Sequence, residues 1–139
     1  MAKASLQRRV LWYSILGITM LGGIAVIATE RAESGPDPAA ARKTREINTA
    51  IALARDVRKE VKNPKSFELA VAIIHADGTV CMTYRATNSF NAIVPAQAIR
   101  RAGTYWVSES DGGFAQRWRS LCAGRGRDET RMVQRFLDG

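Results

Sequence analysis

A run of nineteen residues without a charge, Val10 to Ala28, constrains this chain more than any other feature. A helix rises about 1.5 Å per residue, so the run would span roughly the 30 Å apolar core of a bilayer. Three basic residues precede it, Lys3, Arg8 and Arg9, and this asymmetry places the N-terminus in the cytoplasm. We therefore predict a cytoplasmic tail over 1–9, a transmembrane helix over 10–28, a linker over 29–37 and an extracytoplasmic domain over 38–139.

A cleaved signal peptide is the alternative interpretation of the same run. Signal peptides have a shorter apolar core and a cleavage site with small residues, and Val26-Ile27-Ala28 before Thr29 offers a mediocre site. The length of the run, and Trp12 and Tyr13 at its cytoplasmic edge, favour an uncleaved anchor with interfacial aromatic residues. Cleavage would release the domain as a secreted protein, and the sequence leaves this open.

The charge of the chain limits its partners. The formal net charge is +8, and without the three cytoplasmic cations 18 basic residues face 13 acidic ones. These basic residues are spread along the chain, whereas nucleic-acid binding requires a clustered basic face. We expect no nucleic-acid partner; anionic lipids, wall polymers and acidic proteins stay open as partners of a basic external domain.

The cysteines, Cys81 and Cys122, are even in number. In an oxidising compartment this favours a disulfide, which would close a loop of about 40 residues. The single histidine, His75, does not stand at zinc-site spacing from them. We expect neither a metal nor a cofactor, and we interpret His75 as a surface residue at the end of a strand.

A long amphipathic helix is predicted after the linker. Asp37 provides an N-cap and Pro38 a first helical residue, and helical character continues to Asn63, where Pro64 stops it. Its apolar stripe consists of Ile47, Ala50, Ile51, Ala54, Val57 and Val61. The stripe favours packing on the domain's own sheet, and self-association through the same stripe remains an alternative.

A hairpin is predicted next, from strand-like runs over 67–75 and 79–86. Asp77-Gly78 between them favours a two-residue type I′ loop. In that register Ile74 would face Cys81. Cys81 and Thr83 would then share their face with a set of small or branched residues, Ala70, Ala72 and Ile74.

The remaining elements complete the predicted fold. Ala92–Ile99 reads as a third strand, with Pro95 indicating an edge or a bulge, and Thr104–Ser108 as a fourth. A short helix over 114–123 would carry Cys122 to Cys81, and a last helix would hold Met132, Val133, Phe136 and Leu137. The predicted fold class is α+β. The transmembrane helix is followed by the long helix on an antiparallel sheet of three or four strands, with a short C-terminal helix tied by the disulfide.

Residues 62–91 carry a pattern made of three short motifs, Asn63-Pro64-Lys65-Ser66, Asp77-Gly78-Thr79-Val80-Cys81 and Asn88-Ser89-Phe90. The pattern resembles that of small exported bacterial domains of unassigned function. Phe67 follows Ser66 directly, whereas two residues separate the serine from the phenylalanine in the pattern, and Asn91 stands where many members have glycine. The match extends to residue 124 if Cys122 is counted as the second cysteine of the pattern. The resemblance implies a compact α+β domain with a disulfide, and it implies no activity.

Two groups of residues are candidate binding sites. The first is an arginine group around Gly124 and Gly126, made of Arg117, Arg119, Arg125 and Arg127. Guanidinium groups with nearby glycine N–H groups can hold an anion, although cations at a helix C-terminus also complement its dipole. The second is the polar loop of Asn88, Ser89, Phe90 and Asn91, whose side chains also have the local backbone as partners.

No pattern predicts catalysis. Glu109 and Asp111 could form a carboxylate pair, but they lie in a Ser/Gly-rich segment where acids commonly form turns. We therefore expect a non-enzymatic protein of the bacterial inner membrane, with its domain in the periplasm. It would act as an accessory or interaction protein of an envelope complex, such as a secretion or transfer apparatus. The alternative is an anion-binding module for lipid head groups or wall polymers through the arginine group.

Overall fold

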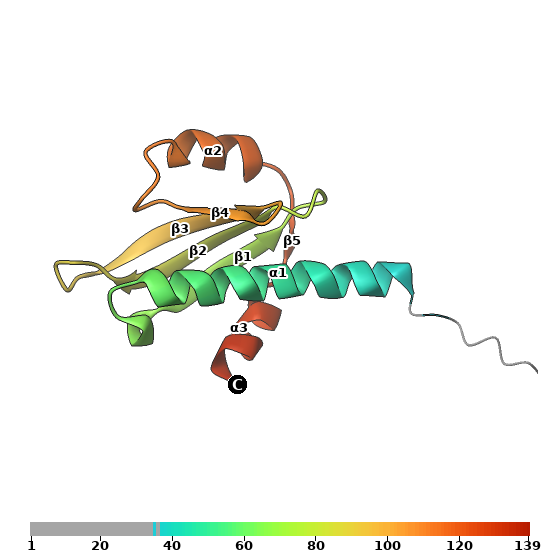
Figure 1. Ribbon diagram of the computed structural model, residues 1–139, viewed down its shortest axis with the longest axis horizontal. Helices are drawn as coiled ribbons and strands as arrows, with labels where there is room; N and C mark the ends of the chain where they lie inside the picture. Colours follow the sequence, from blue (N-terminus) through green and yellow to red (C-terminus); the bar gives the residue numbers. More distant parts are fainter. Residues whose placement is uncertain (1–34, 36) are drawn as a thin grey trace, which may run out of the picture. The chain divides into compact units, whose positions relative to one another are not determined.

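The structure is a computed structural model that describes residue 35 and residues 37–139 (Figure 1). This part contains three α-helices and a five-stranded antiparallel sheet of order β4-β3-β2-β1-β5. The elements are α1 (Pro38–Glu60), the 3-10 helix η1 (Pro64–Ser66), β1 (Glu68–Ile74), β2 (Val80–Thr87), β3 (Ile93–Arg101), β4 (Thr104–Val107), α2 (Phe114–Leu121), β5 (Arg127–Asp128) and α3 (Thr130–Asp138).

The predicted fold is wrong in two respects. The sheet has five strands rather than three or four, and the disulfide ties α2, which is not the C-terminal helix. Within the described residues no helix has the length and apolarity needed to cross a membrane. The predicted membrane helix over 10–28 lies outside the described residues.

The elements form three layers (Figure 1). The long helix α1 contacts β1, β2 and β3, and α3 contacts both α1 and β1, so these two helices cover the same face of the sheet. Helix α2 lies over the opposite face. The sheet is therefore covered on both sides, as its largely apolar strands require.

Helix α1 begins as the sequence predicts. The Asp37 carboxylate accepts a hydrogen bond from the Ala39 N–H at 2.9 Å, and Pro38 is the first helical residue. The helix ends at Glu60 rather than Asn63, since Val61 is extended. Asn63 instead caps η1, because its side chain accepts a hydrogen bond from the Lys65 N–H at 3.1 Å. The residue predicted to end α1 therefore starts the next helix.

The main core lies between α1 and the sheet. All six residues of the predicted stripe are buried, which confirms the packing of the helix on its own sheet, and Leu53 is buried with them. The sheet contributes Ala72, Ile74, Val80, Met82 and Tyr84 to the same cluster. Val133 of α3 is also buried there.

The β1–β2 hairpin differs from the prediction by one residue. The loop has three residues, because His75 N–H donates to the Thr79 carbonyl at 2.8 Å and Gly78 N–H to the His75 carbonyl at 2.9 Å. Gly78 has φ +81°, whereas Asp77 is not in the left-handed region that a type I′ turn requires. Cys81 consequently pairs with Ile73 rather than Ile74. A shift of one residue exchanges the faces of a strand, so Ile74 enters the core.

A two-residue loop instead joins β3 to β4. Arg101 pairs with Thr104, and the two residues between them, Ala102 and Gly103, have φ +48° and +84°. Both central residues thus take the backbone sign of a type I′ turn. Alanine pays a steric cost for this conformation that glycine does not.

Strand β3 accommodates Pro95 because only one neighbouring strand pairs with it there. Pro95 is paired with Arg85 of β2, but the pairing of β3 with β4 stops at Ala98 and Val107. That part of β3 is therefore an edge, as the sequence predicts for a proline that has no N–H to donate. Strand β5 was not predicted; Arg127 and Asp128 pair with Ile74 and Ile73 at the other edge of the sheet.

Candidate functional site

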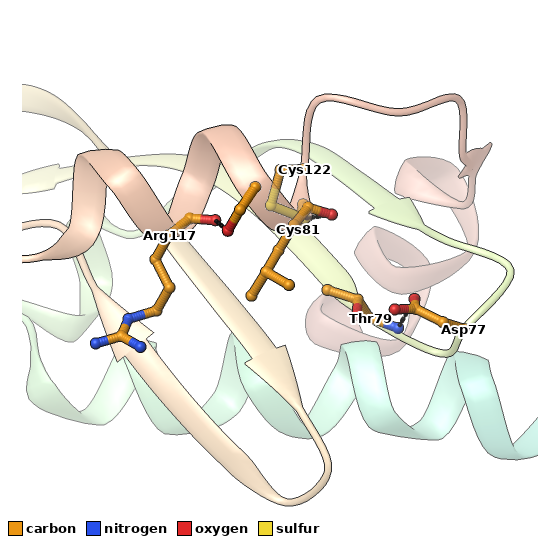
Figure 2. The surroundings of a disulfide bond; sticks show 7 residues. Asp77, Thr79, Cys81, Arg117 and Cys122 are labelled. Carbon is orange, nitrogen blue, oxygen red and sulfur yellow. Dashed lines mark hydrogen bonds between the residues drawn. A yellow bond between two sulfur atoms is a disulfide. The ribbon is translucent and has the colours of Figure 1, made fainter.

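The predicted disulfide between Cys81 and Cys122 is present, with Cα atoms 5.9 Å apart. Figure 2 shows it joining β2 to the end of α2, close to the hairpin turn that holds Asp77 and Thr79. Cys122 caps α2 and donates its N–H to the Trp118 carbonyl at 2.8 Å. The short helix is thereby fixed against the face of the sheet opposite α1.

The burial of Phe114 and the contact of Arg117 with Trp106 add to the attachment of α2. Phe114 is buried and stacks on Trp118 with ring centroids 5.8 Å apart. The Arg117 guanidinium lies 4.7 Å from the centroid of Trp106, at the end of β4, a distance within the range of a cation–π interaction. The disulfide therefore supplements a small apolar contact rather than replacing one.

The position of His75 differs from the prediction. It was predicted at the surface, but it is only 9% exposed. One of its ring nitrogens and the two cysteine sulfurs lie within 4.8 Å of one another. Its Nε2 is buried and has no hydrogen-bond partner among the described residues. A Cβ built on Gly124 would lie 3.8 Å from its Nδ1, so the segment after α2 packs closely over the imidazole.

The predicted arginine group is not one site. Arg117 on α2 donates to the Asp111 carboxylate at 3.0 Å. Arg127 on β5 donates to Glu46 at 2.9 Å and to Glu129 at 2.5 Å. Both guanidinium groups are thus committed to carboxylates within the domain.

The other two arginines are less constrained. Arg119 on α2 and Arg125 in the segment before β5 are exposed, and neither forms an ion pair with the residues described by the structure. They remain available to an external anion, but only two of the four predicted members keep that capacity.

The Arg127 ion pairs link β5 to α1 and to Glu129. Hydrogen bonds from Arg127 and then Arg42 lower the pKa of Glu46 below its ordinary value. Glu129, 8% exposed, also lies 3.8 Å from the Lys43 ammonium. These contacts tie the first half of α1 to β5, so we assign Arg127 a structural role.

The polar loop between β2 and β3 is ordered by its own side chains. The Asn88 carboxamide oxygen accepts from the N–H groups of Phe90 at 2.9 Å and Ala92 at 3.0 Å. Lys62 donates to the Ser89 carbonyl at 3.0 Å and to the Asn91 side chain at 3.1 Å. The loop therefore presents Phe90, which is 90% exposed, from a braced backbone.

The carboxylates Glu109 and Asp111 have different environments. Asp111 accepts a hydrogen bond from the Gly113 N–H and one from Arg117, and these lower its pKa. Glu109 is exposed in the same segment. Asp111 thus forms the turn before α2, the alternative that its sequence context favoured.

Comparison with known proteins adds no assignment. The pattern over residues 62–91 that resembles small exported bacterial domains stays a prediction. No family model, no curated protein and no solved structure matches the chain.

Proposed function

We propose that this chain is a non-catalytic interaction protein of a bacterial envelope complex, acting outside the cytoplasm and anchored at the membrane. The apolar run at 10–28 supports the anchoring. The disulfide supports an oxidising compartment. The observation that carries the proposed activity is the exposure of Phe90 on a loop held by hydrogen bonds.

The loop has the physical properties of a binding anchor. Burying an aromatic side chain of this size contributes about 1.5–3 kcal/mol. Because Asn88 and Lys62 already fix the loop, little conformational entropy is lost on binding. Aromatic anchors seated in partner pockets dominate many interfaces. The partner we propose is therefore a protein with an apolar pocket for the Phe90 ring.

A second exposed apolar side chain extends this surface. Ile93 is 54% exposed at the start of β3, where it pairs with Thr87 of β2. Phe90 lies in the connection between β2 and β3, and Ile93 is the first residue of β3. A partner pocket that takes Phe90 would thus have Ile93 at its rim.

Photo-crosslinking in intact cells tests the proposal. A photoreactive phenylalanine analogue replaces Phe90 in the full chain, and the matched control replaces Phe136, which is 51% exposed on α3. We expect one reproducible protein adduct from position 90, absent from position 136 and lost when Ile93→Asp is added. Equal capture from both positions, or capture that survives Ile93→Asp, would contradict the proposal.

Anion binding through Arg119 and Arg125 is the second candidate, since neither forms an ion pair with the described residues. It predicts binding to anionic lipid vesicles that weakens steeply with salt. An apolar Phe90 interface would be nearly insensitive to salt. Vesicle binding that persists in Phe90→Ala and disappears in Arg119→Gln/Arg125→Gln would favour this candidate.

A further inference from the structure

We propose that the domain, when its disulfide is reduced, binds a zinc-class divalent metal ion through His75, Cys81 and Cys122. The ligand atoms of these three side chains already lie within 4.8 Å of one another. They come from the β1–β2 turn, from β2 and from the end of α2. The site is assembled by the fold rather than by a local sequence motif, which is why the spacing of the residues does not indicate it.

The unpartnered imidazole is the independent observation that indicates a ligand. His75 is 9% exposed, and its Nε2 finds no hydrogen-bond partner among the described residues. A buried polar group without a partner is costly. Coordination by a metal would use the lone pair of a neutral imidazole nitrogen and remove this cost.

The donor set matches zinc. Two thiolates and one imidazole are ligands that zinc prefers, at about 2.3 Å for sulfur and about 2.0–2.1 Å for nitrogen. Two sulfurs in a tetrahedral site then lie about 3.7 Å apart. Once the covalent bond is broken, side-chain rotation can bring Cys81 and Cys122 to that separation. Three protein ligands leave the fourth position to water or an anion.

The imidazole of His75 is reached from a surface groove. This groove of about 440 Å³ is lined by His75, Ala76, Gly126 and several cations, among them Arg125 and Arg127.

The chemistry of the conversion is balanced by an external dithiol reductant. The dithiol gives two electrons and two protons to the Cys81–Cys122 bond and becomes a disulfide itself, leaving two thiols on the domain. The metal ion then displaces both thiol protons to solvent as two sulfur–metal bonds form. The metal-bound and disulfide forms are therefore mutually exclusive.

Metal titration of the full chain without an added histidine tag tests the inference. The protein is reduced with a phosphine under anaerobic conditions and titrated with Co²⁺, then with Zn²⁺ in competition. We expect one Co²⁺ per chain, with tetrahedral d–d and thiolate charge-transfer absorption, displaced by Zn²⁺. The oxidised protein should show neither band.

Variants separate the three ligands from packing effects. His75→Ala should weaken Zn²⁺ binding at least tenfold. Thr79→Val, a neighbouring buried position in the same turn, should leave it unchanged. Equal affinity of the wild type and His75→Ala would overturn the proposal, as would the absence of a Co²⁺ spectrum. If reduction unfolds the domain, Zn²⁺ must restore its circular dichroism, and failure to do so also overturns the proposal.

Discussion

Removing the disulfide should cost the domain a large part of its stability. Cys81 and Cys122 are 41 residues apart in the sequence. The chain-entropy model gives about 13 cal/mol/K of unfolded-state entropy for a loop of this length, or about 4 kcal/mol at 25 °C. Total stabilities of single domains are about 5–15 kcal/mol. We therefore expect the double variant Cys81→Ala/Cys122→Ala to remain folded only marginally.

The loss should be distributed unevenly over the structure. Without the bridge, α2 keeps the burial of Phe114 and the contact of Arg117 with Trp106. The sheet keeps the core against α1. Hydrogen exchange should therefore show amides of α2 losing protection before those of β2, because the small contact of α2 opens locally.

Urea unfolding at neutral pH, with a chelator present, measures the effect. The double variant should lose about 4 kcal/mol, and its m-value should rise because the unfolded chain exposes more surface. Reduced wild-type protein serves as the matched control and should agree with the variant. A loss below about 1 kcal/mol would refute the entropic argument, and a loss confined to the reduced wild type would indicate a free-thiol effect instead.

Three further predictions concern the sheet edges and the ion pairs. Gly126→Ala should destabilise by about 1–3 kcal/mol in urea unfolding, because its Cβ would overlap Ile73 Cγ2 and come within 3.0 Å of the Ile74 carbonyl; unchanged stability would show that β5 shifts freely. Ala102→Asn should stabilise by about 1 kcal/mol, since φ is +48° there; a lower melting temperature would contradict this. The hydrogen bonds that lower the pKa of Glu46 contribute stability above its unfolded pKa, which is lost as pH falls through the lowered folded pKa. The stability difference between wild type and Glu46→Gln should thus be largest above about pH 5 and shrink below it, and a pH-independent difference in urea titrations would exclude the ionised contact as its source.

Much of the fold was accessible from local chemistry. The start of α1 follows from Asp37 and Pro38, and its buried stripe follows from the spacing of apolar residues. The disulfide was predicted from an even number of cysteines in a chain whose N-terminal apolar run predicts export. Each of these features depends on neighbouring residues or on the compartment, and the sequence contains that information directly.

The misplaced features depend on pairing between distant segments. Strand β5 consists of Arg127 and Asp128 alone, so it has no apolar alternation from which to predict it. The arginine group looked continuous along the chain, but Arg117 pairs with Asp111. Arg127 pairs with Glu129 and with the distant Glu46. Contacts such as that of Arg127 with Glu46, 81 residues away, are set by the tertiary arrangement.

The hairpin turn shows how one residue of loop length decides the chemistry of the site. With the predicted two-residue loop, His75 and Cys81 would have lain on opposite faces of the sheet. The three-residue loop closed by Gly78 shifts the pairing by one, and alternate side chains of a strand share a face. Ile73 and His75 therefore lie on the side of Cys81, while Ile74 enters the core. The meeting of the imidazole with the two sulfurs, on which the proposed metal site depends, is thus a consequence of the turn.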